Sequence, residues 1–214
     1  MKVSIRLLFL LTIVSLISFS CSQSSSEHFF KDGSAKYQLK DYSGAIKDLS
    51  KSIELDPNNV EAYYVRAICN SRMQNYNSAL QDFSKVIELE PDYKNAYLNR
   101  AFYVKVKTDD YQGAIEDYNK FIELNKYKNN AFAFNNRGFA KFKLNDFKGA
   151  MEDIEESIKF DPKNSYAYKN RALVFIAIDS LKSACEDLHT AIDLGYSNKF
   201  DNEVNELIDS YCDK

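Results

Sequence analysis

Residues 56–59 read Asp-Pro-Asn-Asn, and residues 90–93 read Glu-Pro-Asp-Tyr, so that Pro57 and Pro91 lie 34 residues apart. Residues 161–164 repeat the motif as Asp-Pro-Lys-Asn. A fixed period of this length is typical of small supersecondary units that stack on one another. The acidic-proline motif therefore marks the end of a repeating unit.

Alignment on this period divides residues 26–198 into five repeats. Their ranges are 26–59, 60–93, 94–130, 131–164 and 165–198. The third repeat is three residues longer, with one additional residue near 108–110 and two around 126–128. Small residues stand at the eighth position of every repeat: Gly33, Ala67, Ala101, Gly138 and Ala172. They also stand at the twentieth position: Ala45, Ala79, Ala114, Ala150 and Ala184.

Aromatic residues recur at positions four, seventeen and twenty-four, and we interpret them as core. They are Phe29, Tyr42, Tyr63, Tyr76, Phe83, Tyr97, Tyr111, Tyr118, Phe134, Phe147 and Tyr168. Together with the small residues and the closing proline, they resemble the tetratricopeptide repeat (TPR) family. The departures are local, since Lys126 replaces the closing proline of repeat three and Leu181 replaces the aromatic at position seventeen of repeat five.

The resemblance implies an all-α fold, a right-handed superhelix of antiparallel helix pairs. Small residues at positions eight and twenty let the two helices of a pair approach closely. Residues 199–214 carry apolar side chains at helical spacing and are predicted to form a C-terminal capping helix.

Composition excludes several classes of function. A formal net charge of -3 provides no basic field for nucleic acid, and two histidines leave little room for a histidine-based metal site. The chain has no HExxH, no GxSxG, no paired CxxC and no phosphate-binding glycine loop with a lysine. We therefore expect no metal, no cofactor, no small-molecule substrate and no enzymatic activity, with an enzyme kept as a remote alternative.

Residues 1–20 are predicted to form a lipoprotein-type signal peptide. Lys2 and Arg6 precede an apolar run that is too short to span ~30 Å of hydrocarbon as a helix. Cys21 follows a small residue and resembles the lipobox of bacterial, Bacteroidetes-like lipoproteins, which implies that Cys21 is lipidated and that residues 21–26 form a tether. Localisation in the bacterial envelope, lipid-anchored and at the outer membrane, follows from this. Plain secretion and an uncleaved anchor are the alternatives.

A ladder of opposite charges runs through the repeats. Four arginines stand at position seven, and aspartates recur at position twenty-three. Because the second helix of one repeat packs on the first helix of the next, we predict structural pairs between neighbouring repeats. These are Asp48 with Arg66, Asp82 with Arg100, Asp117 with Arg137 and Asp153 with Arg171. Such pairs leave the arginines little capacity for an anionic ligand.

The cysteines other than Cys21 are Cys69, Cys185 and Cys212. Cys185 and Cys212 lie equally far in sequence from the turn around residues 195–198, so an antiparallel hairpin would bring them to the same height. A disulfide between them is predicted, with two independent thiols as the alternative. Cys69 is interpreted as a packing residue.

The resemblance places the ligand surface in a concave groove lined by positions two, five, nine and twelve of each first helix. The apolar residues at these positions are Phe30, Tyr37, Tyr64, Ile68, Leu98, Phe102, Phe132, Phe139, Phe142, Tyr166, Leu173 and Ile176. A groove of this composition suits an extended or helical apolar peptide. Alternatively, the curvature of the superhelix or a second copy buries some of these rings.

The sequence thus predicts a membrane-anchored scaffold or adaptor that binds a protein or peptide partner in an apolar TPR groove of the bacterial envelope. The resemblance extends to pilus pilotins and to accessory lipoproteins of envelope machines. A self-associating structural envelope protein, with no ligand in the groove, is the alternative from a different class.

Overall fold

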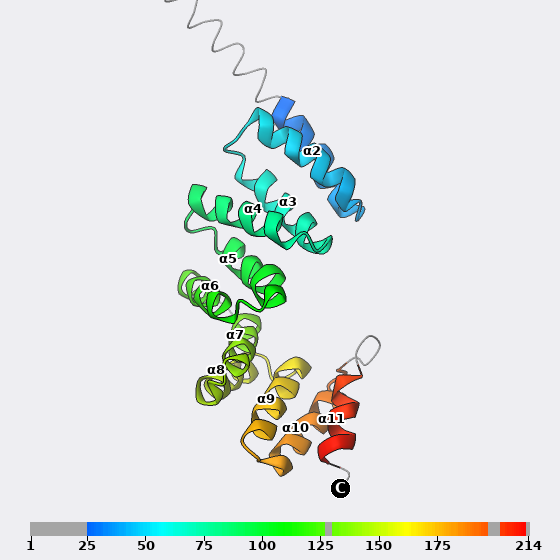
Figure 1. The fold of residues 1–214 in the computed structure, drawn as a ribbon, viewed down its shortest axis with the longest axis vertical. Helices are drawn as coiled ribbons and strands as arrows, with labels where there is room; N and C mark the ends of the chain where they lie inside the picture. The colour runs from blue at the N-terminus through cyan, green and yellow to red at the C-terminus, as the bar shows by residue number, and fades with distance from the viewer. Residues whose placement is uncertain (1–24, 127–129, 197–201, 213–214) are drawn as a thin grey trace, which may run out of the picture. The chain divides into compact units, whose positions relative to one another are not determined.

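The computed structural model describes residues 25–126, 130–196 and 202–212 (Figure 1). These residues form helices joined by short turns, and no β-strand occurs among them. The predicted all-α fold of antiparallel helix pairs is confirmed. No helix within the described ranges is long and apolar enough to cross a bilayer. The predicted signal peptide, residues 1–20, and Cys21 lie outside the described residues.

The chain divides into two compact units, Met1–Ala96 and Tyr97–Lys214, and each is described by itself. The first unit has a helix over residues 25–38, followed by α2 (Tyr42–Leu55), α3 (Val60–Arg72) and α4 (Tyr76–Leu89). The boundary falls within α5 (Lys94–Arg100). The second unit continues with η1 (Ala101–Lys105), η2 (Val106–Thr108), α6 (Tyr111–Leu124), α7 (Ala131–Lys143), α8 (Phe147–Phe160), α9 (Ser165–Ala177), α10 (Leu181–Asp193) and α11 (Glu203–Tyr211).

The small residues lie where two paired helices meet. Ala67 and Ala79, on α3 and α4, are fully buried, and so are Ala172 and Ala184 on α9 and α10. At Gly138, an added Cβ would lie 2.7 Å from Ile154 Cγ1 and 3.0 Å from the carbonyl oxygen of Ala150. The backbones therefore approach too closely for even a methyl group at this point.

The additional residue near 108–110 appears as a π-helical turn, η1, inside the first helix of repeat three. A π turn takes up one residue without ending the helix. As a result Lys105, the twelfth residue of its repeat, lies 3.3 Å from Asp117, while Lys141, the eleventh of its repeat, lies 2.8 Å from Asp153. The π turn thus restores the phase of the repeat after the insertion.

The turn between paired helices has a constant geometry. One residue just after each first helix adopts a left-handed conformation, with φ between 57° and 63°. These residues are Lys40, Gln74, Asp109, Asn145 and Asp179. In three repeats an aspartate then caps the second helix, for example Asp146, whose carboxylate accepts a hydrogen bond from the Gly149 backbone N–H at 2.9 Å.

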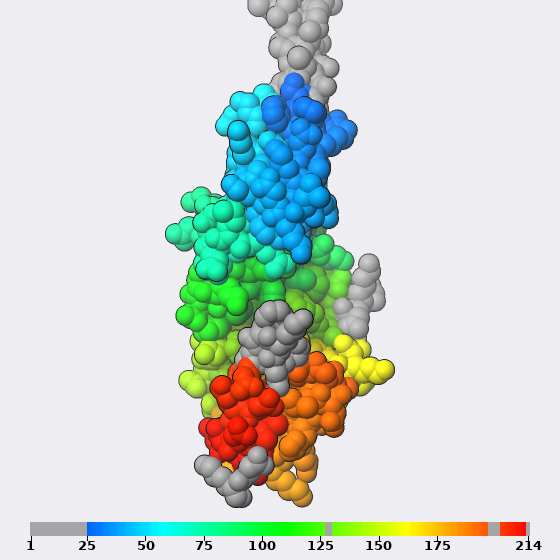
Figure 2. All heavy atoms as spheres, turned by 90° about the vertical axis from the view of Figure 1, so that its right-hand side faces the viewer, coloured from blue at the N-terminus to red at the C-terminus, as the bar shows by residue number. Residues whose placement is uncertain are grey.

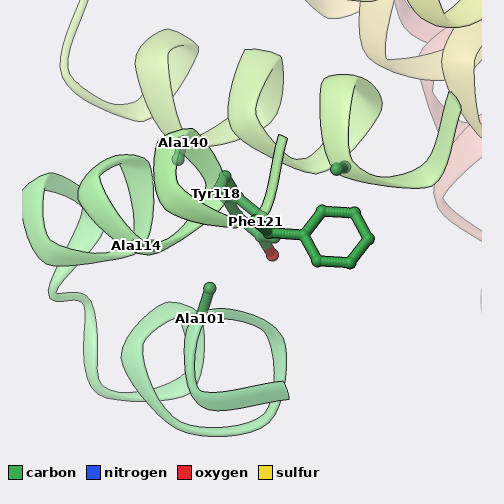
Figure 3. Packing of buried hydrophobic residues seen from close by; sticks show 6 residues of the cluster. Ala101, Ala114, Tyr118, Phe121 and Ala140 are labelled. Atoms are coloured by element: carbon green, nitrogen blue, oxygen red, sulfur yellow. The ribbon is translucent and has the colours of Figure 1, made fainter. Parts of the chain in front are cut away.

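The core of the second unit contains a buried tyrosine whose hydroxyl has no hydrogen-bond partner among the described residues. Tyr118 of α6 is fully buried beside Ala101, Ala114 and Phe121 (Figure 3). Burial raises the pKa of this phenol far above its usual value, and the neighbouring Asp117 carboxylate raises it further. The phenol is thus un-ionised and unsatisfied.

We expect Tyr118→Phe to stabilise the protein by about 1 kcal/mol, because the substitution removes a buried hydroxyl without a partner and keeps the ring. The matched control is Phe83→Tyr, since Phe83 occupies the same repeat position in α4 and is also fully buried. This reverse substitution should destabilise. Urea denaturation followed by circular dichroism measures both, and a loss of stability in Tyr118→Phe would contradict the prediction.

Candidate functional site

The arginine at position seven binds the aspartate of its own repeat. Nε and Nη2 each donate to one carboxylate oxygen, at 2.5 to 2.9 Å. The pairs are Arg66 with Asp82, Arg100 with Asp117, Arg137 with Asp153, and Arg171 with Asp187. The predicted pairing between neighbouring repeats is therefore wrong for Asp48 with Arg66, Asp117 with Arg137 and Asp153 with Arg171, and Asp82 and Arg100 likewise bind within their own repeats.

The physical reason is the fork geometry of the guanidinium group, which presents two parallel N–H donors to one carboxylate. A third nitrogen remains, and it makes the contact between repeats. Arg66 Nη1 donates to Ser50 Oγ of α2 at 2.9 Å, and Arg137 Nη1 donates to Asn119 Oδ1 of α6 at 2.6 Å. Neighbouring repeats are thus linked through neutral groups at position twenty-five.

Each of these arginines also lies over the aromatic ring three residues earlier. The guanidinium carbon is 5.2 to 5.9 Å from the ring centroid of Tyr63, Tyr97, Phe134 or Tyr168. The cation–π contact with a partly buried ring adds to the stabilisation that the ion pair provides. The position-four rings are half-buried, so their role includes this contact as well as packing.

Some of the aspartates have a second cation. Lys105 lies 3.3 Å from Asp117, and Lys141 lies 2.8 Å from Asp153. In the first repeat Asp32 stands in place of the arginine, and Asp48 instead pairs with Lys36 at 2.6 Å. Within the described residues of the second unit, Asp187 forms an ion pair with Arg171 alone, and Phe175 stands where the lysine would be. The hydrogen bond to Asp187 raises the pKa of Arg171 above its usual value.

We expect Arg171→Ala to destabilise by about 3 kcal/mol, because it leaves the buried Asp187 carboxylate without a cation. Arg137→Ala should cost roughly half as much, since Lys141 still faces Asp153. Adding Lys141→Ala to Arg137→Ala should bring the loss up to that of Arg171→Ala. Urea denaturation measures the free energy of unfolding of all three variants. Equal losses of stability for the two single variants would show that Lys141 does not compensate for the missing arginine.

The twelve predicted groove residues differ in exposure. Phe132 and Tyr166, both at position two, are 47% and 56% exposed. Ile68 is buried, which does not fit its predicted place on a binding surface. The others are half-buried: Phe30, Tyr37, Tyr64, Leu98, Phe102, Phe139, Phe142, Leu173 and Ile176.

Most of the half-buried rings pack within the fold. Phe30 and Tyr37 border the core of the first unit, and Tyr64 lies with its centroid 5.0 Å from Tyr93. Phe142 packs on Phe147, and Ile176 borders the core under α11. The candidate surface therefore narrows to α7 and α9, and we call it the α7–α9 face, defined by Phe132, Asn135, Phe139, Tyr166, Asn170 and Leu173.

The exposed rings of this face rest on other rings. Phe132 lies edge to face with Phe102, with centroids 5.1 Å apart. Tyr166 lies 5.0 Å from Tyr196, which is itself buried. Each exposed ring is thus held from one side and open on the other, as an anchor for a partner requires.

Two asparagines connect the helices of the face. Asn170 Nδ2 donates to Asn135 Oδ1 at 3.0 Å, and the two residues are only 8% and 6% exposed. Our sequence interpretation missed this pair because it considered only apolar residues. The available signal was an asparagine at position five of repeat four and another at position six of repeat five.

The C-terminal helix α11 closes one end of the second unit. Val204 is fully buried against the core of α9 and α10. A disulfide joins Cys185 to Cys212, with Cα atoms 5.7 Å apart, and Lys169 of α9 lies 2.8 Å from Glu203. In Figure 2, α11 in red lies directly against the orange of α10.

The free cysteine is unreactive, and the histidine, cysteine and acidic side chains of the described residues form no metal-binding cluster. Cys69 is free and fully buried, and burial raises the pKa of its thiol to about 11, which keeps it protonated. Within the described ranges, no three His, Cys, Asp or Glu side chains gather as metal ligands. A hollow of about 360 Å³ in the first unit is lined by carboxylates, including Glu27, Glu61 and Glu90, and contains no nucleophile paired with a base.

The sequence and fold were compared with those of known proteins. Family models described as TPR repeat and Tetratricopeptide repeat match residues 33–69, 60–93, 95–128 and 133–164, more than half of the chain. The chain belongs to the tetratricopeptide repeat family. No curated protein matches it.

Several solved structures have a similar fold. MamA 41-end from Desulfovibrio magneticus RS-1 is 17% identical, with a TM-score of 0.74 over 83% of this chain and 97% of that chain. PilW, described as a widely conserved type IV pilus biogenesis factor, is 17% identical, with a TM-score of 0.73 over 86% of each chain. YrrB, described as a TPR protein with an unusual peptide-binding site, is 19% identical, with a TM-score of 0.69 over 80% of this chain and 87% of that chain. At these identities the likeness concerns the fold.

Proposed function

We propose that this protein is a non-enzymatic scaffold that binds a partner protein or peptide on its α7–α9 face. The observation that carries the proposal is the pair of exposed rings, Phe132 and Tyr166, each supported by a second ring. Exposed aromatic side chains backed by a rigid surface are typical anchors of protein interfaces. The peptide-binding site of the similarly folded YrrB supports a ligand of the same kind.

The charges around this face point away from an ionic ligand. Arg137, Arg171 and Lys169 are bound to Asp153, Asp187 and Glu203. A ligand that relied on charge would have to break these pairs, each of which is at least partly buried. Shape and ring contact are therefore the expected basis of recognition.

We further propose that the scaffold is anchored by a lipid on Cys21 in the bacterial cell envelope, at the outer membrane. Basic residues, a short apolar run, a small residue and a cysteine follow one another in the order of a lipoprotein signal. The serine-rich residues after Cys21 suit a tether.

The interaction proposal is tested in intact cells by replacing Phe132 or Tyr166 with a photo-crosslinking amino acid. We expect a discrete crosslinked product with another protein from both positions. The matched control is Lys148 of α8, which is exposed but does not belong to the α7–α9 face, and it should give no such product. A product with twice the mass of the chain would favour self-association, and no product from either ring would refute the proposal.

The anchor is tested by metabolic labelling with a radioactive fatty acid. The unaltered chain should carry the label and partition into detergent, because one acyl chain transfers apolar carbon from water. Cys21→Ser should lose both properties, whereas Cys69→Ser should keep them because Cys69 is buried. A label retained by Cys21→Ser would rule out this cysteine as the lipid attachment site.

A further inference from the structure

The aspartate of the second repeat lacks the lysine that three of the other repeats supply. In those repeats a lysine near the end of the first helix forms an ion pair with the aspartate at position twenty-three. The pairs are Lys36 with Asp48, Lys105 with Asp117 and Lys141 with Asp153. In the second repeat Asn70 stands at the lysine position. Within the described residues, Arg66 is the one cation that Asp82 binds.

Asn70 approaches the same carboxylate oxygen as the lysines do, but it lies farther away. Lys141 Nζ is 2.8 Å from Asp153 Oδ2. Asn70 Nδ2 is 3.5 Å from Asp82 Oδ2, which is the limit of a hydrogen bond, and an amide carries no charge. The shorter side chain therefore leaves the place of the lysine ammonium unfilled.

A hollow of about 280 Å³ lies at this place. We call it the Asp82 hollow; its lining includes Ile46 of α2, Asn70 of α3, and Ser78 and Asp82 of α4. Asn70 is only 6% exposed and Asp82 only 5%, so the polar groups lie at the buried end of the hollow. Its volume is far larger than the ~30 Å³ that one water molecule occupies in the liquid, which leaves room for an organic group.

The second acceptor that the lysines use is present in this repeat as well. Lys105 Nζ donates to the carbonyl oxygen of Gly113 at 2.9 Å, and Lys141 Nζ donates to that of Gly149 at 3.4 Å. Both glycines directly precede the small residue at position twenty. Ser78 holds this position in the second repeat and lines the Asp82 hollow. An ammonium group in the hollow thus meets the same two acceptors, a carboxylate and a helix carbonyl.

The remaining lining suits the rest of an alkylammonium ligand. An ammonium group has three N–H donors, of which the Asp82 carboxylate and the Ser78 carbonyl accept two. The Asn70 amide oxygen provides the third acceptor, because it takes only one long hydrogen bond, from Asn75 Nδ2 at 3.5 Å. Ile46 offers an apolar surface on which methylene groups pack, as the stems of lysine side chains do.

We propose that the Asp82 hollow binds a primary alkylammonium group. The ammonium donates to Asp82, to the Ser78 carbonyl and to the Asn70 amide oxygen, and its alkyl stem lies against Ile46. A lysine side chain of another protein and a free small amine share this chemistry. The hollow lies in the first unit and the α7–α9 face in the second, so the inference does not depend on the proposed function.

The test follows the amide resonances of the full-length chain, labelled with ¹⁵N in mild detergent, during titration with n-butylammonium chloride at constant ionic strength. We expect saturable shifts of the backbone amides of residues 78–82 and of the Asn70 side-chain amide. The dissociation constant should be on the order of 10 mM, as expected for a few charge-assisted hydrogen bonds. Tetramethylammonium chloride has the same charge but no N–H donor, and equal shifts with this salt would overturn the inference.

The variant Asn70→Lys restores the pattern of the third and fourth repeats. It should weaken the binding of butylammonium about tenfold or more, because its own ammonium group pairs with Asp82. It should also unfold at a higher urea concentration, which shows that the fold is intact. The matched control is Asn77→Lys on the exposed surface of α4, outside the lining of the hollow, and it should leave the affinity unchanged. Unchanged affinity in Asn70→Lys would overturn the inference.

The converse variant creates a site. Lys141→Asn removes the lysine beside Asp153 and leaves the Gly149 carbonyl in place. Butylammonium should then shift the amide resonances of residues 149–153, which it should not do in the unaltered chain. Failure to create this site would invalidate the comparison between repeats and the inference with it.

Two further ligands distinguish the sources of the ammonium group. Nα-acetyl-lysine N-methylamide represents a lysine within a polypeptide, and cadaverine represents a free diamine. Tighter binding of the lysine derivative assigns the hollow to a lysine of another protein, and tighter binding of cadaverine assigns it to a small amine. Either result supports the inference, whereas saturable binding of neither would overturn it. The crosslinking experiment at Phe132 and Tyr166 decides the proposed function independently.

Discussion

The close approach of two helices in each repeat is the constraint on which the rest of the structure depends. At Gly138 the space left by the partner helix does not admit a methyl group, and Ala67, Ala101 and Ala172 are fully buried at the equivalent position. Because the backbones are this close, the side chains around the contact have fixed directions. The arginine one residue before each small residue therefore faces the second helix of its own repeat, where the aspartate lies.

The ion pair within the repeat and the neutral contact between repeats have different structural roles. The bidentate pair fixes the angle between the paired helices, and the remaining guanidinium nitrogen reaches Ser50 or Asn119 of the preceding repeat. A neutral contact requires less desolvation than a second buried charge would. The α7–α9 face is left uncharged by the same arrangement, since its neighbouring cations are all occupied.

The helix pairs could be predicted because their signal is local: a proline every 34 residues and small residues at two fixed positions. The aspartate that each arginine binds could not be predicted from the sequence. Asp82 and Asp48 both stand at a spacing that allows a bond to Arg66, and only the rotation of the helices decides which of them forms it. The prediction of which groove residues are exposed failed for a similar reason. Ile68 and Phe132 are both apolar groove positions, yet only the packing of neighbouring helices shows that one is buried.

The π turn at Ala101–Lys105 shows how the array accommodates a change in length. An additional residue in a helix normally rotates every later side chain by about 100°, which would separate Lys105 from Asp117. Here the widened turn absorbs that rotation before the aspartate is reached, so the stacking surface offered to α7 is unaffected. A single-codon insertion can therefore enter the interior of a repeat, and the residues of later repeats keep their contacts without compensating substitutions.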